Sequence, residues 1–593
     1  MMHLRMRIFV SAILFSLTLA CGGSPGDGSE AGQAPSSSEQ QTQQPKLQAP
    51  SSIVIDIPDQ PVLHLERVED LTEEVADWLL DFSDKLRRRD TGAALGWLDT
   101  GFFGHGLAAL DLQEQEAMPL DARRTVWNPA SAPILAREEF LASVMSYLGT
   151  WERVDNVLWK VKGAEFQDDR RPWCDAKLFL RMLGVDAGGG RVAITGWAHA
   201  RARKRSGEWQ LERFRLDSLE EARRDAPMFS DVSAAAGVAH SWARFGTTQN
   251  QSYAWNGAAA GDIDGDGDWD LFLPSDGRNY LYLAEADGTY SEQAQTRGVA
   301  GPEAGTGPVF GDFDNDGDQD LFVAQVGWTE AGDKLGGRLA QYYQNDGKGH
   351  FQRQANWPGL ELPVTAYHAL ALDYDLDGWL DLFLCGYGRV EAEHNNSWIE
   401  ATNGAPNVLL RNLEGKGFEN CSTKAGLEDL QWSYAAAAAD VNGDGWTDIY
   451  VANDYGSNRL YANQGDGTFK DMAPKLGIVD RGNGMGSSFG DLDGDGRLDL
   501  YVSNMSSTAG NRILGRLGDD IDPEMFAALK KLAAGNTIFR STNDGTFERM
   551  PSEAGGVNAN WAWSSALFDV DLDGNLDVFC TNGFVTGDLP HDT

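Results

Sequence analysis

The chain has 593 residues and a formal net charge of −40 at pH 7, and it is too long for one ordinary domain. The charge is uneven, because residues 51–227 carry 24 Lys and Arg against 31 Asp and Glu, whereas residues 228–593 carry 22 against 55. A surface this acidic argues against nucleic acid as a partner, since binding phosphates requires Lys and Arg.

Residues 1–21 are predicted to be an export signal. Arg5 and Arg7 precede an apolar run at 8–19, which is too short for a membrane-spanning helix. The run ends in LTLAC, which resembles a bacterial lipobox with Cys21 as the lipidated residue. We therefore expect a protein of the bacterial cell envelope, anchored by its lipid at the outer membrane or cell surface. Plain cleavage near Ala20, which would give a secreted protein, is the alternative.

Residues 22–50 are rich in Gly, Ser, Gln and Pro. Such a composition cannot build a packed core. We expect a flexible linker between the lipid and the folded domains.

Residues 51–227 are predicted to form a small α+β domain. Asp70 and Glu73 make a capping pair that would open an amphipathic helix, and a second helix is expected at about 137–148. The strand-like runs that follow lie at 157–166, 176–184, 191–204 and 208–216. Helices followed by a curved antiparallel sheet resemble the cone-shaped SnoaL-like (nuclear transport factor 2-like) fold.

The resemblance to that superfamily implies that the cone can hold a pocket. The side chains that could line one are His105, Asp155, Cys174 and His199. Surface or core positions are the more frequent role of such residues, so a catalytic pocket is the minor alternative.

Cys174, Cys385, Cys421 and Cys580 lack metal-ligand spacing and are expected to be free thiols, with one disulfide left open.

Residues 228–593 contain six acidic loops of one design, Asp-x-Asp-x-Asp-Gly-x-x-Asp, here called loops 1 to 6 and numbered by positions 1 to 9. The residues at positions 1, 3, 5 and 9 are Asp262, Asp264, Asp266 and Asp270 in loop 1; Asp312, Asp314, Asp316 and Asp320 in loop 2; Asp373, Asp375, Asp377 and Asp381 in loop 3; Asp440, Asn442, Asp444 and Asp448 in loop 4; Asp491, Asp493, Asp495 and Asp499 in loop 5; and Asp569, Asp571, Asp573 and Asp577 in loop 6.

Oxygen ligands on alternate residues suit a hard cation of the size of Ca²⁺, which accepts six to eight oxygens in forgiving geometry. The Gly at position 6 permits the bend that returns the last Asp to the ion. The loops are not EF-hands, because position 12 is never the Glu that the EF-hand requires. Each loop instead leads into a short apolar run, such as Asp270-Leu-Phe-Leu, which predicts a buried strand. The sequence therefore predicts about six calcium sites.

The loops belong to a longer repeat. In each of the last five repeats an aromatic residue stands 22 residues before the first Asp of a loop; these residues are Tyr290, Phe351, Phe418, Phe469 and Phe547. Asp-Gly turns before these aromatics predict hairpins. About four short strands per unit, repeated, indicate a β-propeller, so the fold class is mainly β. The count gives six blades, closed by a strand at Phe229, and seven blades are left open.

These motifs resemble the FG-GAP/VCBS repeats of integrin α-chain propellers and of bacterial relatives of cartilage acidic protein, over about residues 229–583. The resemblance implies that the carboxylates at positions 1, 3, 5 and 9 bind Ca²⁺, with the position-7 carbonyl as a backbone ligand. Asn442 carries less charge, so loop 4 is expected to bind more weakly. Cartilage acidic relatives carry a further C-terminal module that this sequence does not reach, and both a shorter member and a truncated chain remain open.

No nucleophile elbow, P-loop, zinc motif or Cys/His pairing is visible in the sequence. The expected function is therefore non-enzymatic binding or adhesion to an extracellular protein or polysaccharide. A surface glycan hydrolase or lyase with its site on the loop face is the alternative. Trp561 and Trp563 fit blade packing, with sugar stacking as the functional option.

Insertions occur only between a loop and the next aromatic residue, chiefly at 324–350, 385–417 and 503–546. Binding residues concentrate on variable loops held by a rigid scaffold. We therefore expect the ligand on the face that carries these insertions. The longest contains an apolar helical pattern from Pro523 to Leu532, which fits either a cap on the blade edge or a contact surface.

Overall fold

The computed structural model describes residues 65–108, 110–118, 121–167, 173–239, 257–274, 278–301, 305–326, 339–361, 363–388, 395–517, 522–551 and 561–582. The predicted signal, Cys21 and the linker lie outside these residues. The chain forms two compact units. The first comprises Met1–Ser230 with Thr508–Gly518 and Thr586–Thr593, and the second comprises Asp231–Ser507 and Asp519–Val585.

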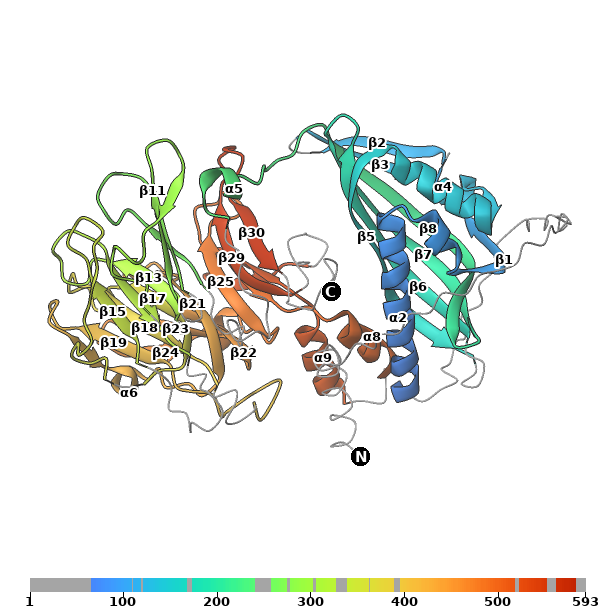
Figure 1. The fold of residues 1–593 in the computed structure, drawn as a ribbon. Helices are drawn as coiled ribbons and strands as arrows, with labels where there is room; N and C mark the ends of the chain where they lie inside the picture. Colours follow the sequence, from blue (N-terminus) through green and yellow to red (C-terminus); the bar gives the residue numbers. More distant parts are fainter. Residues whose placement is uncertain are drawn as a thin grey trace, which may run out of the picture. The chain divides into compact units, whose positions relative to one another are not determined.

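The first unit combines helices with one large sheet (Figure 1). Its elements are α2 (Leu65–Arg87), α3 (Thr91–Leu95), β1 (Leu98–His105), β2 (Leu112–Met118), β3 (Ala122–Trp127), η1 (Pro129–Ser131), β4 (Ile134–Ala136), α4 (Arg137–Gly149), β5 (Trp151–Phe166), β6 (Trp173–Asp186), β7 (Arg191–Arg205), β8 (Glu208–Arg224) and α8 (Thr508–Leu517).

The sheet runs in the order β2-β3-β8-β7-β6-β5, and β1 adds to it through a parallel pairing with β8. Alternate residues of β7 are buried, which places one face of the sheet in the core. Helix α2 packs on β5 and α4 on β1. Trp159 lies at the centre, where its ring stacks on Phe214 at 4.7 Å and meets Phe82 edge-on at 5.3 Å. One continuous apolar core therefore holds this unit together.

The predicted second helix and the antiparallel strands after it are confirmed as α4 and β5 to β8, but the strands β1 to β4 precede α4, so the sheet does not simply follow the helices. The helix expected to open at Asp70 begins earlier, at Leu65, so that start was wrong. The strands β1 to β4 were not predicted. Strand β2 is exposed along its whole length, so it offers no apolar alternation from which a strand could be recognised.

The second unit is a series of antiparallel sheets, one per repeat. Its elements are α5 (Ser233–Ala236), β9 (Ala259–Gly261), β10 (Asp270–Leu273), β11 (Tyr280–Ala284), β12 (Tyr290–Glu292), β13 (Thr306–Gly311), β14 (Asp320–Ala324), β15 (Gln341–Gln344), β16 (Gln352–Arg353), β17 (Ala366–Leu372), β18 (Asp381–Gly386), β19 (Val408–Asn412), β20 (Phe418–Asn420), α6 (Ser422–Ala425), β21 (Trp432–Ala439), β22 (Asp448–Tyr455), β23 (Arg459–Asn463), β24 (Phe469–Asp471), α7 (Ala473–Leu476), β25 (Gly484–Gly490), β26 (Asp499–Asn504), α9 (Pro523–Leu532), β27 (Thr537–Ser541), β28 (Phe547–Arg549), β29 (Ala562–Phe568) and β30 (Asp577–Asn582).

Five sheets have four strands in chain order, and β29 with β30 forms a two-stranded sheet within the described residues. Each sheet and the loop it contains are called one repeat, numbered 1 to 6 as the loops are. Consecutive sheets contact each other through their first strands. The apolar clusters lie between sheets, as where Phe322 of β14 shares a cluster with Leu382 of β18. The repeats are thus stabilised by their neighbours.

The four predicted strands per repeat are confirmed in repeats 1 to 5. The turns that leave the first four sheets contain a glycine with positive φ. Gly298 has φ +86°, and a Cβ there would lie 2.3 Å from the carbonyl oxygen of Phe351 in the next sheet. The predicted closing strand at Phe229 was wrong, because Phe229 lies outside any strand and its side chain is exposed.

The predicted helix from Pro523 to Leu532 is confirmed as α9, which Asp522 caps by accepting two backbone N–H groups. The preceding helix, α8, was not predicted. It belongs to the first unit, where the guanidinium of Arg516 forms an ion pair with Glu165 at 3.2 Å.

Within the part of the chain that the structure describes, no helix is long and apolar enough to cross a membrane.

Candidate metal centres

The Asp at position 1 closes each loop on itself. In loop 1 the carboxylate of Asp262 accepts hydrogen bonds from the backbone N–H groups of Gly265, Asp266 and Gly267 at 2.9–3.1 Å. The position-1 Asp of the other five loops accepts from positions 5 and 6 in the same way. This geometry bends the loop around a common centre.

The Asp at position 9 ties the loop to its sheet. One oxygen of Asp270 accepts from the N–H of Ile263 at position 2, at 3.1 Å, and the other from Ala284 at the end of β11, at 2.8 Å. The position-5 carboxylate accepts the N–H of position 7, as Asp266 does from Asp268 at 2.9 Å. This bond fixes the peptide that precedes position 7, the residue whose carbonyl is predicted to be a ligand.

Five loops bring three carboxylates together, with one oxygen of each within 4.8 Å of the others. The groups are Asp262, Asp264 and Asp270; Asp312, Asp314 and Asp316; Asp373, Asp375 and Asp381; Asp491, Asp493 and Asp499; and Asp569, Asp571 and Asp577. Positions 1, 3 and 9 thus converge in four loops, and positions 1, 3 and 5 in loop 2.

The remaining predicted ligands lie outside these groups. They are Asp266, Asp320, Asp377, Asp495 and Asp573, together with the loop 4 residues Asp440, Asn442, Asp444 and Asp448. Asp320 differs from its counterparts because it also accepts a hydrogen bond of 2.6 Å from the hydroxyl of Tyr342. In loop 4 the amide oxygen of Asn442 accepts from the N–H of Asp444 at 2.9 Å.

Three position-3 carboxylates each have one unpaired oxygen. Oδ1 of Asp264, Asp314 and Asp375 is buried without a hydrogen-bond partner. The second oxygen is engaged from outside, by Gln344 at 2.8 Å on Asp314 and by Arg411 at 2.6 Å on Asp375. A buried carboxylate oxygen without a partner is costly. A cation at the centre of the loop would satisfy it, so the donor set fits Ca²⁺.

The electrostatics of the loops also favour a cation. Burial, followed by the neighbouring carboxylates, raises the pKa of Asp264. Burial raises the pKa of Asp381 to about 7, against the hydrogen bonds that lower it. Loops 1 and 3 thus crowd like charges in a partly desolvated place, which costs free energy that a divalent cation would offset.

The conformation of position 4 was not predicted from the sequence. This residue has a positive φ in all six loops: Gly265, Asn315, Leu376, Gly443, Gly494 and Leu572. The glycines and the asparagine tolerate this region, but Leu376 and Leu572 are strained in it. The frequency of Gly and Asn at position 4 was the available signal.

The four residues proposed for a pocket in the first unit do not form one group, although His105 and His199 both interact with Asp217. His199 Nδ1 lies 2.5 Å from a carboxylate oxygen of Asp217. The side chain of His105 interacts electrostatically with that Asp, but burial, the larger influence, lowers the pKa of the imidazole. Asp155 pairs with Arg153 and Arg191 on the surface, and Cys174 is buried in the core. The four described cysteines are free thiols, as predicted.

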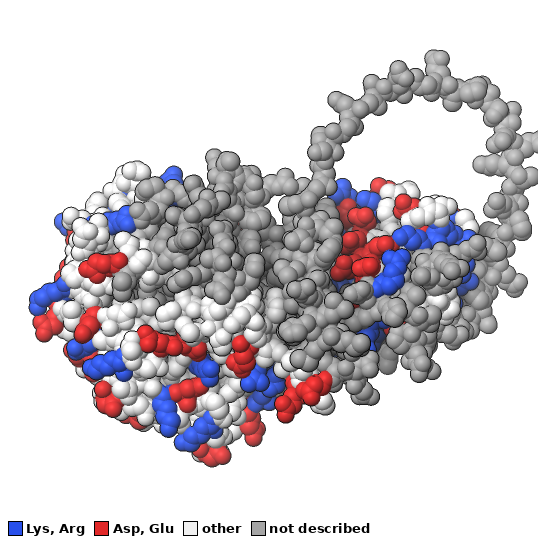
Figure 2. All heavy atoms as spheres, turned by 90° about the horizontal axis from the view of Figure 1, so that it is seen from below, with Lys and Arg blue, Asp and Glu red and all other residues white. Residues whose placement is uncertain are grey.

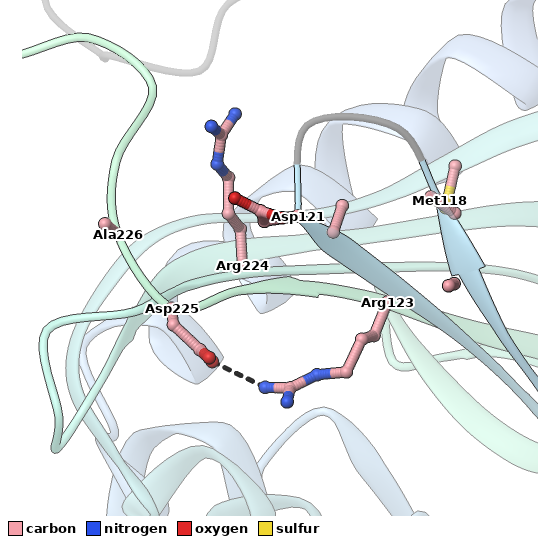
Figure 3. Close-up of a pocket in the computed structure, with 8 residues that line it drawn as sticks. Met118, Asp121, Arg123, Arg224, Asp225 and Ala226 are labelled. Atoms are coloured by element: carbon pink, nitrogen blue, oxygen red, sulfur yellow. Dashed lines mark hydrogen bonds and ion pairs between the residues drawn. The ribbon is translucent and has the colours of Figure 1, made fainter.

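A hollow of about 530 Å³ lies at one end of the same sheet (Figure 3). It is lined by Met118 and Arg123 from the β2–β3 hairpin and by Arg224 and Asp225 at the end of β8. The guanidinium of Arg123 pairs with Asp225. This hollow is open and mostly lined by exposed side chains, and it does not match the chemistry of the loops.

Comparison with known proteins supports the repeat. Residues 242–323, 440–502 and 519–580 match the FG-GAP-like repeat, which confirms the predicted resemblance. Cartilage acidic protein 1 of Xenopus tropicalis is 31% identical over 86 residues, which are 14% of this chain and 13% of that protein. The chain therefore spans only a small part of the curated relative.

Two solved structures are similar to parts of the chain. A lectin of Agrocybe aegerita, described as recognising non-reducing terminal N-acetylglucosamine, is 15% identical, covers 64% of this chain and 81% of its own, and has a TM-score of 0.33. The protein Aln2 from a Streptomyces species is 11% identical, covers 25% of this chain and 89% of its own, and has a TM-score of 0.19.

Proposed function

We propose that this chain is a calcium-stabilised binding protein of the bacterial cell envelope, anchored through a lipid on Cys21. The repeats form a β-propeller that holds a protein or polysaccharide outside the cell. About six calcium ions occupy loops 1 to 6, and loop 4 binds most weakly. The unpaired, buried Oδ1 atoms of Asp264, Asp314 and Asp375 are the observation that carries the proposal.

The topology supports a ligand on the end of the sheets away from the loops. Each loop joins the first strand to the second, as loop 2 joins β13 to β14. The insertions leave from the end of the second strand, and adjacent strands are antiparallel. Loops and insertions therefore lie at opposite ends of a sheet, so the variable segments can adapt to a ligand without disturbing the cation sites.

A series of aromatic rings lies at this insertion end. Neighbouring rings have centroids 4.7–6.1 Å apart, and the series contains Trp398, Tyr455, Trp432, Tyr387, Tyr367, Tyr434 and Trp563. Tyr367, Tyr387 and Trp432 are buried, whereas Trp398, Tyr434 and Tyr455 are half-buried. Half-buried rings on a rigid base suit stacking on sugar rings, so we favour a polysaccharide over a protein ligand.

The experiment is a binding screen of the purified protein against cell-wall and matrix polysaccharides, with calcium and with EDTA. We expect calcium-dependent retention of one class of polysaccharide. Trp398→Ala should weaken retention, whereas Trp269→Ala, an exposed tryptophan in loop 1, should not. The reverse pattern would place the ligand on the loop face. Release of reducing ends during the incubation would favour the glycan hydrolase or lyase instead.

A further inference from the structure

Three asparagines occupy one position in successive repeats. Asn345 follows β15, Asn412 ends β19 and Asn463 ends β23. Their side chains are buried, with exposed fractions of 9%, 2% and 3%. A buried amide must satisfy its two N–H donors and its oxygen, so the partners of these side chains indicate their role.

Each asparagine is first bonded to its own loop. The backbone N–H of Asn412 donates to the position-9 carboxylate of Asp381 at 2.7 Å, and its side-chain nitrogen donates to the position-8 carbonyl of Leu380 at 2.9 Å. Asn345 and Asn463 make the same two bonds in loops 2 and 4, at 2.8–3.3 Å. The asparagine therefore holds the residues on both sides of the position 8–9 peptide.

The same side-chain nitrogen also reaches the loop of the preceding repeat. Asn345 donates to the position-2 carbonyl of Ile263 in loop 1 at 2.7 Å. Asn412 donates to Phe313 in loop 2 and Asn463 to Tyr374 in loop 3, both at 2.8 Å. One NH₂ group thus joins two acidic loops, and each asparagine lies 82 to 99 residues after the position-2 residue to which it donates.

The position-2 residue completes a path from carboxylate to carboxylate in loops 1 and 3. There its N–H donates to the position-9 Asp of the same loop, as Ile263 does to Asp270 and Tyr374 does to Asp381. In loop 2 the second oxygen of Asp320 accepts instead from the hydroxyl of Tyr342. From Asp270 the path runs through Ile263 to Asn345, and from Asn345 to Asp320. A cation that fixes Asp270 would therefore restrict Ile263, the residue to whose carbonyl Asn345 of the next repeat donates.

The fifth repeat breaks the pattern. Ser541 occupies the asparagine position, and its N–H still donates to Asp499 at 2.8 Å. Its hydroxyl Oγ is buried without a partner. Among the hydrogen bonds of the described residues, none joins Ser541 to loop 4. The shared NH₂ bonds therefore run from loop 1 to loop 4. The full path from carboxylate to carboxylate is present between loops 1 and 2 and between loops 3 and 4.

We infer that Asn345, Asn412 and Asn463 are positioning residues that couple calcium binding in loops 1 to 4, while loop 5 binds independently. This inference rests on the proposed function of the loops as calcium sites. Without its cation a loop relaxes under the repulsion of its carboxylates, and the shared NH₂ group transmits that shift to the next loop. Coupling between sites is reciprocal, and factors of about 5 to 150 are typical.

The test is a calcium titration of the full chain, read by hydrogen exchange of the amides in each loop. Asp264→Ala disables loop 1, and we expect it to raise the calcium midpoint of loop 2 about fivefold or more. In an Asn345→Ser background, which copies the residue of repeat 5, the same change should leave loop 2 nearly unaltered. An unshifted loop 2 midpoint in Asp264→Ala, or an equal shift in both backgrounds, would overturn the coupling.

The matched control uses loops 4 and 5. Asn442→Ala disables position 3 of loop 4 and should leave the midpoint of loop 5 unchanged, whereas adding Ser541→Asn should create a shift. This gain does not depend on whether Asn345→Ser folds, and a loop 5 midpoint indifferent to Ser541→Asn would overturn the inference. If calcium protects none of the loops in the natural chain, the proposed function itself fails.

Discussion

The two units are stabilised in different ways. The first has one continuous core in which aromatic rings from helices and strands meet. The second divides its apolar residues into clusters between neighbouring sheets, such as the one that joins Phe383 of β18 to Ile449 of β22. Acidic and basic side chains are scattered among the other residues over the described part of the face seen in Figure 2. A repeat array of small clusters gains more from cations that fix its loops than a unit with a continuous core does.

The largest expected effect is the removal of calcium. With a dissociation constant of ~0.1 mM and ~1 mM calcium, each site contributes roughly 1.4 kcal/mol, and six sites together about 8 kcal/mol. This is comparable to the stability of a whole domain. EDTA should lower the melting temperature of the second unit and spare the first, as followed by calorimetry with hydrogen exchange. Equal melting of the second unit with and without chelator would contradict the difference in how the two units are stabilised.

A cavity in the continuous core tests whether that core stabilises the first unit independently of the second. Trp159→Ala removes the ring between Phe82 and Phe214, and we expect a loss of about 3–5 kcal/mol in that unit. Because the core of the first unit is its own, calcium protection of loops 1 to 6 should persist in the variant. Hydrogen exchange reports both units in one experiment, and loss of loop protection would show that their stabilities are linked.

Two substitutions in loop 1 test which positions of a loop bind the cation through their side chains. Asp264→Ala removes an oxygen of the loop 1 group, and loss of that site should cost roughly 1.4 kcal/mol at ~1 mM calcium. Asp268→Ala should cost little, because position 7 is expected to bind through its backbone carbonyl. Calcium titrations of the two variants give the comparison. Similar losses from both would mean that the positions are wrongly assigned.

The smallest effect concerns strain in a loop. Leu376 has φ +56° and an exposed side chain, so Leu376→Gly should stabilise the second unit by about 1 kcal/mol or less. Leu430→Gly, at an exposed leucine outside the left-handed region, is the control and should not stabilise. Denaturant unfolding of both variants in calcium measures the difference. A destabilised Leu376→Gly would mean that the leucine side chain contributes packing that outweighs its strain.

The repeat could be predicted because its structure is determined by residues that are close together in the sequence. The 22-residue spacing, the Asp-Gly turns and the apolar run after each loop all lie within one repeat. The unpredicted features depend on contacts between distant segments. The bond from Asn345 to Ile263 crosses 82 residues, and helix α8 joins the first unit from within the repeat region. Strand β2 carries no apolar face, so periodicity could not reveal it.

The most direct measurement is the number of calcium ions that the full chain binds, by calorimetric titration after chelator removal. We predict about six ions, one per loop, with the weakest site lost on Asn442→Ala. A chain that takes up no calcium, or only a single ion, would contradict the assignment of the loops as calcium sites.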